Sequence, residues 1–133
     1  MTTDGASQRP ENVAFLIWAA TPERPELCVT PLVHALAALA LDCTVEIHFA
    51  GPAVRWLVEG VAAERYPTPA REKAILAFLR EASAAGARLL ACSMARASWI
   101  GPDESLIVEC HGAAGATAFV ARMLDPAWRT GVF

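Results

Sequence analysis

The sequence predicts a single α/β domain built around a parallel β-sheet. Short apolar runs alternate along the chain with segments of helical periodicity, which is the pattern of repeated βαβ units. The apolar runs are almost continuous, as expected for strands that are covered on both faces of a sheet. The chain has 133 residues, enough for one domain with a core of its own.

Five strands are predicted, each an apolar or β-branched run next to turn residues. They are residues 13–18, 44–49, 88–91, 106–109 and 128–133. The polar opening, residues 1–12, is predicted to be a flexible tail, and residues 13–133 form the domain. The four cysteines of the chain contain no C-x-x-C pair, so neither a zinc ribbon nor a dithiol motif is encoded locally.

The helices in the first half of the domain are predicted from capping signals. Thr30 followed by Pro31 indicates an N-cap and a first helical residue, so we expect a loop over residues 21–30 and a helix from there to about Leu41. A proline also opens the next predicted helix, residues 53–59, and Gly60 is its expected stop.

The helices in the second half are predicted from their periodicity. Residues 69–84 are amphipathic, with charged side chains opposite an apolar face, and a short helical stretch covers residues 93–97. Residues 112–124 are predicted to place Phe119, Val120 and Met123 on a buried face before Asp125 and Pro126 end the helix.

Composition and charge exclude several classes of protein. The formal net charge is −3 and Lys73 is the single lysine, which argues against a nucleic-acid partner. No apolar run approaches the ~20 residues of a membrane span, and the first residues lack the apolar core of a signal peptide. We therefore expect a cytoplasmic protein with reduced thiols. The mean hydropathy of +0.36 predicts an apolar interface and hence a homo-oligomer, with Trp56, Trp99 and Trp128 as core or interface anchors.

Cys92 is the leading candidate for a functional residue. It follows a predicted strand and precedes a predicted helix, and ligands of α/β proteins bind at the carboxyl edge of the sheet. A helix amino terminus favours the thiolate, which is the reactive form of cysteine. The alternative is a small buried hydrophobe. The same edge is predicted to collect three more groups of residues: 18–20, 49–51 and Cys110-His111-Gly112.

Other site types fit the sequence less well. Gly112 to Gly115 open a helix but lack the spacing of a nucleotide-binding loop. Cys92, Cys110, His111 and His48 have no spacing typical of a metal site, so no metal is expected. A Cys–His hydrolase would use His48 or His111 as base, but no orienting carboxylate can be assigned. A Cys92–Cys110 disulfide stays open. His34 is expected to be an interior histidine, and Glu46 to mark an edge strand or an exposed face.

The order of these segments resembles the DsrE/DsrF-like sulfur-relay family. The resemblance rests on VEIHFAGPAVRWL at residues 45–57, ACSMA at 91–95, GAA at 112–114 and Phe133 behind a Trp-Arg-Thr stretch. It covers nearly the whole chain from Val13 onward. It implies a flavodoxin-like three-layer α/β sandwich around a five-stranded, mostly parallel sheet, and oligomers that are often trimers or hexamers. It also implies that the residue matching Cys92 carries sulfur as a persulfide without a cofactor. Cys110-His111 is not part of the shared pattern.

These observations predict a sulfur carrier or sulfurtransferase that accepts sulfur on Cys92 and passes it to a partner thiol. Ser93, Cys110, His111 and Gly112 are predicted to shape the binding site around it. Sulfur donor and acceptor proteins would then be the partners. Two other functions stay open: a non-catalytic oligomeric binding or scaffold protein on the same fold, and a thiol redox protein that uses Cys92 and Cys110.

Overall fold

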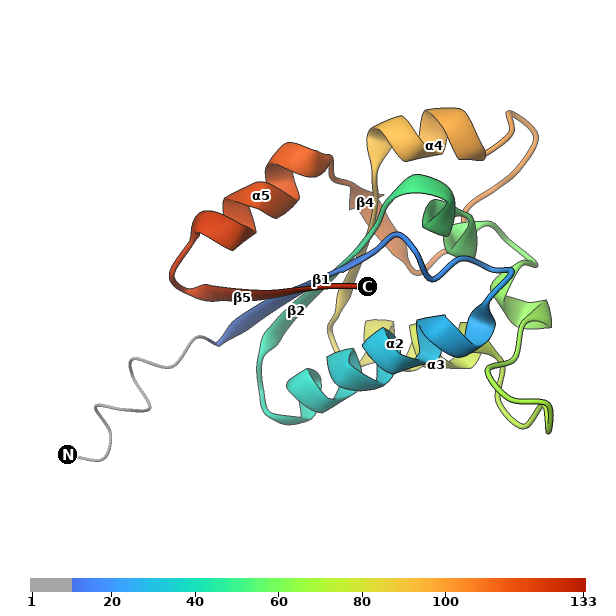
Figure 1. Ribbon diagram of the computed structural model, residues 1–133, viewed down its shortest axis with the longest axis horizontal. Helices are drawn as coiled ribbons and strands as arrows, with labels where there is room; N and C mark the ends of the chain where they lie inside the picture. The colour runs from blue at the N-terminus through green and yellow to red at the C-terminus, as the bar shows by residue number, and fades with distance from the viewer. Residues whose placement is uncertain (1–10) are drawn as a thin grey trace.

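Residues 11–133 are described by the computed structural model (Figure 1), and residues 1–10, which hold most of the predicted tail, lie outside them. The strands are β1 (Asn12–Ile17), β2 (Thr44–Phe49), β3 (Arg88–Ala91), β4 (Cys110–Ala113) and β5 (Trp128–Val132). The α-helices are α2 (Pro25–Ala40), α3 (Ile75–Ala84), α4 (Ser93–Trp99) and α5 (Ala116–Leu124). Two 3₁₀ helices, η1 (Gly51–Leu57) and η2 (Ala62–Glu64), follow β2.

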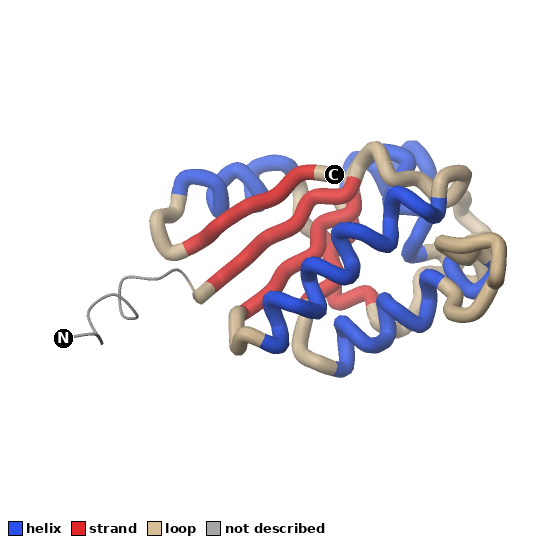
Figure 2. Tube along the Cα trace, turned by 60° about the horizontal axis from the view of Figure 1, so that its bottom comes forward, coloured by secondary structure: helices blue, strands red, loops and turns tan. Residues whose placement is uncertain are grey.

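The five strands form one parallel sheet in the order β4-β3-β2-β1-β5. Figures 1 and 2 show α2 and α3 side by side on one face of the sheet, while α5 lies on the other. The three layers confirm the predicted α/β class and are consistent with a flavodoxin-like sandwich. After β4 the chain returns past β1 to add β5 on the far side. This reversal of direction is a topological switch, and such a point leaves a crevice at the carboxyl ends of the strands.

The core lies mainly between the sheet and the α2–α3 layer. Val45, Ile47 and Phe49 of β2 are fully buried there, packed with Leu32 of α2 and Leu79 of α3. Alternate residues of a strand point to opposite faces, so residues 46 and 48 face the α5 side instead. Among the described helices, α5 packs along that face, while α4 lies at the carboxyl end of the sheet against η1 (Figure 1). The two layers are therefore unequal, and the α5 side is where open space remains.

The fourth strand differs from its prediction. Residues 106–109 are expected in the sheet because Leu-Ile-Val is strongly strand-forming, but β4 begins at Cys110, directly after the predicted strand ends. Leu106 instead forms an isolated antiparallel bridge with Val58, and the Ile107 N–H donates to the Leu57 carbonyl at 2.8 Å. The apolar run thus packs beside η1, and four residues of low strand propensity form the edge strand.

Three helices begin at positions other than those predicted. Helix α2 starts at Pro25 and passes through Pro31, so the predicted loop at residues 21–30 is half helical and Thr30 is not the N-cap. Helix α3 starts at Ile75 rather than residue 69, because Arg71 adopts a positive φ of 54° that no α-helix accepts. Helix α5 starts at Ala116, after extended backbone at Gly115. The predicted helix at 53–59 is the 3₁₀ helix η1.

Several side chains also lie elsewhere than expected. Phe119 is the buried residue of α5, whereas Val120 and Met123 are 45% and 55% exposed, so the predicted buried face is only partly covered. His34 is exposed on α2 rather than interior, and its Nδ1 lies 2.8 Å from the Thr30 carbonyl. Trp56 is a core anchor, fully buried, with its indole N–H donating to the Ala20 carbonyl.

None of the described helices has both the length and the apolar character needed to cross a lipid bilayer.

Candidate functional site

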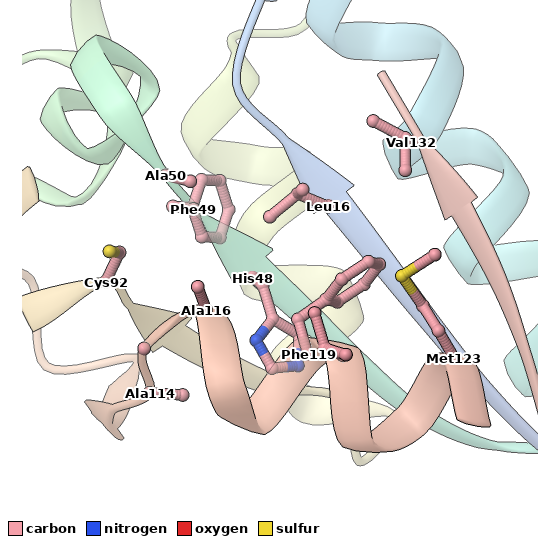
Figure 3. A pocket seen from close by; sticks show the side chains of 12 residues that line it. Leu16, His48, Phe49, Ala50, Cys92, Ala114, Ala116, Phe119, Met123 and Val132 are labelled. Atoms are coloured by element: carbon pink, nitrogen blue, oxygen red, sulfur yellow. The ribbon is translucent and has the colours of Figure 1, made fainter. Parts of the chain in front are cut away.

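A cavity of about 260 Å³ opens between α5 and the carboxyl ends of the strands (Figure 3). Its floor comes from Leu16 of β1, His48 and Phe49 of β2, and Val132 of β5. Residues 114–116 and the side of α5 that carries Phe119, Val120 and Met123 form the opposite wall. The cavity lies where the sheet reverses its strand order, and α5 is the helix of the described residues that packs on this face.

Cys92 stands at one end of this cavity, and Val132 and Met123 stand at the other (Figure 3). It is half-buried and lies directly after β3, as the sequence predicts. Its N–H donates to the Phe49 carbonyl at 2.9 Å, and its own carbonyl accepts from the Arg96 N–H at 2.8 Å. These two backbone bonds tie the cysteine to β2 and to α4, so the thiol is mounted on a rigid part of the fold.

The other cysteines do not line the cavity. Cys28 is fully buried on α2, and burial raises the pKa of its thiol to about 12. Cys43 is half-buried and packs against the core before β2. The thiol of Cys28 is therefore a poor nucleophile, because the thiolate is the reactive form. Among the four cysteines, Cys92 is the one that lines the cavity.

Cys110, His111 and Gly112 do not share the cavity with Cys92, so the prediction that they meet at one edge is wrong. Cys110 pairs in register with Leu89, three residues before Cys92, and the residues from this segment that line the cavity begin at Ala114. The three residues from Leu89 to Cys92 span about 10 Å along β3. The Cα atoms of Cys92 and Cys110 are therefore farther apart than the roughly 7 Å that a disulfide can bridge. Cys92 and Cys110 therefore do not form a disulfide in this fold.

His111 has a structural role in the edge strand. A register shift between Leu89 and Leu90 interrupts the β3–β4 ladder. The Leu89 N–H donates to Nδ1 of His111 at 3.1 Å, so the imidazole replaces a missing backbone acceptor. Ser93 is exposed at the start of α4 and lines a separate surface hollow with Arg96. The cavity therefore gathers only Cys92 among the five predicted site residues.

A charged network lies behind the cavity, centred on Glu46. This residue is 4% exposed on the central strand β2, and the expectation of an edge or exposed position is wrong. Its carboxylate accepts two bonds from Arg122 of α5, from Nε at 3.0 Å and from Nη2 at 2.7 Å. The Arg122 guanidinium also stacks over the Trp128 ring at 4.0 Å. Burial opposes ionisation of Glu46, but the bonds from Arg122 and His48 prevail and hold its pKa below the usual range.

His48 connects this network to the cavity. Its Nε2 lies 3.0 Å from Oε1 of Glu46, and because a carboxylate oxygen only accepts, Nε2 carries the hydrogen. The residue is 3% exposed, and burial lowers its pKa despite the nearby carboxylate. A neutral imidazole with its hydrogen on Nε2 has a free acceptor at Nδ1. That atom is buried and has no hydrogen-bond partner among the described residues.

Glu46 is the orienting carboxylate that sequence reasoning did not find. Glu46 and His48 are separated by two positions on one strand, so they point to the same face of the sheet. That spacing is visible in the sequence, but the partner that neutralises Glu46 comes from a helix 76 residues away. In the part of the chain that the structure describes, no cluster of three His, Cys, Asp or Glu residues has the arrangement of a metal site.

Comparison with known proteins agrees with the architecture. The model of the DsrE/DsrF-like family matches residues 12–128. No curated protein matches the chain significantly. Among solved structures, the chain is similar to MTH1491 from Methanobacterium thermoautotrophicum, a protein of unknown function, with a TM-score of 0.61 and 19% identity over 92% of this chain and 98% of that one. At this identity the similar structure supports the fold alone. Because the family model spans nearly all of the described residues, the chain belongs to the DsrE/DsrF-like family.

Proposed function

We propose that this protein is a cytoplasmic sulfur carrier that holds sulfur as a persulfide on Cys92 and passes it to a partner thiol. The observation that carries the proposal is the place of Cys92, the one cavity-lining cysteine in a member of the DsrE/DsrF-like family. Sulfur relay is an activity of this family. A carrier needs an accessible thiol on a rigid mount, and the backbone bonds of Cys92 to Phe49 and Arg96 supply the mount.

The proposed chemistry needs no external oxidant or reductant. The Cys92 thiolate attacks the terminal sulfur of a donor persulfide, R–S–SH, and the donor's S–S bond breaks. Its electron pair leaves on the donor thiolate, R–S⁻, and Cys92 becomes Cys92–S–SH. In the second step an acceptor thiolate attacks the outer sulfur of Cys92–S–SH and releases the Cys92 thiolate. Each step is a thiol exchange in which one S–S bond forms and one breaks.

Mass spectrometry of the intact protein tests this function directly. After incubation with a small persulfide donor, the wild-type chain should gain one sulfur atom, and peptide mapping should place it on Cys92. The variant Cys92→Ser should lose this adduct. The matched controls Cys43→Ser and Cys110→Ser should keep it, because neither thiol lines the cavity. Equal sulfur uptake by Cys92→Ser and the parent protein would contradict the proposal.

Assembly into a homo-oligomer is part of the same proposal. Large apolar side chains are exposed on α5 and at the carboxyl edge of the sheet. They include Met94 at 82%, Leu124 at 79%, Met123 at 55% and Trp18 at 53% exposure. Apolar patches of this kind mark interaction surfaces. They also favour the second candidate function, a non-catalytic oligomeric scaffold, which would assemble without taking up sulfur.

Light scattering separates a monomer from an assembly. At micromolar concentration the protein should have a mass that is a multiple of 14.2 kDa, with a trimer or hexamer expected. Replacing Leu124 with Glu should shift the mass toward one chain, because a charge would be buried in the interface. Leu41→Glu is a suitable control, since Leu41 is equally exposed but follows α2 on the opposite face. A mass of 14.2 kDa for the wild type would contradict assembly.

A further inference from the structure

We propose that the cavity beside Cys92 binds an uncharged, largely apolar small-molecule thiol, whose S–H group donates to Nδ1 of His48. This inference rests on the proposed function, because the thiol is the acceptor that takes sulfur from Cys92. It narrows the partner to one chemical class and assigns a role to His48.

The size and lining of the cavity indicate the class of ligand. A dry cavity of about 150 Å³ holds a benzene molecule, so the volume of about 260 Å³ here accommodates a ring with a short substituent. The walls are apolar and include Leu16, Phe119, Val120 and Met123. The ionisable residues that line the cavity are His48 and Cys92. Among residues 11–133, no lysine, arginine or carboxylate lines this space. A charged thiol would therefore lose its hydration without gaining a partner.

The unpaired Nδ1 of His48 indicates where the polar group of the ligand lies. Buried polar atoms are almost always paired, and an exception calls for a ligand, a water or a catalytic role. Nδ1 of His48 is such an exception among the described residues. In Figure 3 the imidazole stands on β2 between Ala116 and Phe119, on the way from Cys92 to the far end of the cavity. A neutral donor placed there would pair the atom.

Glu46 and Arg122 prepare His48 for proton transfer. The carboxylate fixes the imidazole with its hydrogen on Nε2 and would stabilise the positive charge that follows when Nδ1 takes a proton. Arg122 keeps Glu46 ionised through two hydrogen bonds. A base that is oriented by a carboxylate is the arrangement that activates a thiol nucleophile.

The step balances with the groups in the cavity. Nδ1 of His48 takes the proton of the bound thiol, R–SH. The resulting R–S⁻ attacks the outer sulfur of Cys92–S–SH, so an S–S bond forms in R–S–SH while the Cys92 S–S bond breaks. The Cys92 thiolate leaves with the electron pair, and the proton on His48 returns to solvent.

A binding experiment tests the cavity without sulfur chemistry. Benzyl alcohol matches a benzyl thiol in shape, and toluene lacks the donor. In the full-length protein, benzyl alcohol should shift the methyl signals of Ala116 and Val120 and the ¹⁵N signal of His48 Nδ1, and toluene should leave the ¹⁵N signal unchanged. Ala116→Leu fills the cavity and should remove binding. Thr117→Leu places the same side chain one residue further on α5, at an exposed position outside the cavity lining, and should keep binding.

A kinetic experiment then tests the thiol class. Sulfur release from Cys92 persulfide to benzyl mercaptan should be about ten-fold faster than release to glutathione, after correction for the reactivity of each thiol toward a free persulfide. Ala116→Leu should remove this preference. His48→Gln should slow release to benzyl mercaptan about a hundred-fold and remove one inflection from its pH profile. Thr117→Leu should behave as the wild type.

The outcomes separate this inference from the proposed function. Failure of Cys92 to take up sulfur contradicts the function itself. A persulfide that forms but is released equally fast to both thiols contradicts the small-molecule acceptor alone and favours a protein acceptor. Absence of benzyl alcohol binding, or binding that survives Ala116→Leu, overturns the cavity as the site.

Discussion

Replacing Glu46 with alanine should lower the free energy of unfolding by about 2 kcal/mol, because it removes the buried acceptor of the hydrogen bonds from Arg122 and His48. The change leaves the Arg122 guanidinium, which is 34% exposed, without its carboxylate partner. It also leaves Nε2 of the buried His48 without an acceptor. Urea-induced unfolding at pH 7, monitored by tryptophan fluorescence, measures the loss.

A matched control is available on α3. Glu81 pairs with Lys73, but both side chains are well exposed, so Glu81→Ala should change the free energy of unfolding by less than about 1 kcal/mol. A double-mutant cycle adds a second check. Once Arg122 is replaced by methionine, Glu46→Ala should cost clearly less than it does alone, since the two residues are in contact. Additive losses, or a loss for Glu46→Ala no larger than that of Glu81→Ala, would contradict a coupled buried network.

The parts of the fold that sequence could predict are those governed by local pattern. The strand at residues 44–49 is predicted with its observed bounds, because its residues are apolar or β-branched and the flanking turns are clear. The four residues of β4 have no such pattern. Their pairing depends on the neighbouring strand and on His111, which supplies an acceptor at the register shift. Long-range pairing of this kind leaves little trace in a local window of sequence.

The candidate site shows the same division. Cys92 at the end of a strand is a local feature, and the structure places it there. The predicted positions of Cys110 and His111 follow from the strand predicted at 106–109, and the error in that strand moves both residues to the wrong end of the ladder. Glu46 is predicted to lie on an edge strand or an exposed face, since a lone carboxylate on an apolar strand is costly to bury. Its burial becomes favourable only with Arg122, which the sequence does not connect to it.

The unequal coverage of the sheet links the fold to the site. Helix α5 is the described helix that packs on the face carrying Glu46 and His48, and its Phe119 ring meets His48 edge-on at 5.2 Å. Arg122, one turn further along, reaches back to Glu46. The same helix thus closes the cavity, neutralises the buried carboxylate and leaves Val120 and Met123 at the cavity wall. A change in how α5 docks would alter the apolar lining and the state of His48 together.

Stability should therefore fall as the pH is lowered from 7 to 5, and His48 should account for much of the change. Burial lowers the pKa of His48 below its ordinary value of 6.5, against the opposing pull of Glu46, with Arg122 and Arg88 also disfavouring the cation. The unfolded chain then binds a proton below pH 6.5 that the folded chain does not bind. Because the unfolded state holds more protons, the free energy of unfolding falls as the pH falls through this range. Glu46 adds to the loss only below its ordinary value of 4.5, since its pKa is also lowered.

Unfolding in urea at pH 7, 6 and 5 measures this dependence. One proton changes the free energy of unfolding by at most about 1.4 kcal/mol per pH unit, which sets the upper limit of the slope from His48. The variant His48→Gln keeps a polar group near Glu46 but does not titrate, so its stability should change less between pH 7 and 5 than that of the wild type. Parallel pH profiles for the wild type and His48→Gln would contradict a lowered pKa of His48, and Nδ1 would then cease to be a free acceptor as the pH falls below 6.5.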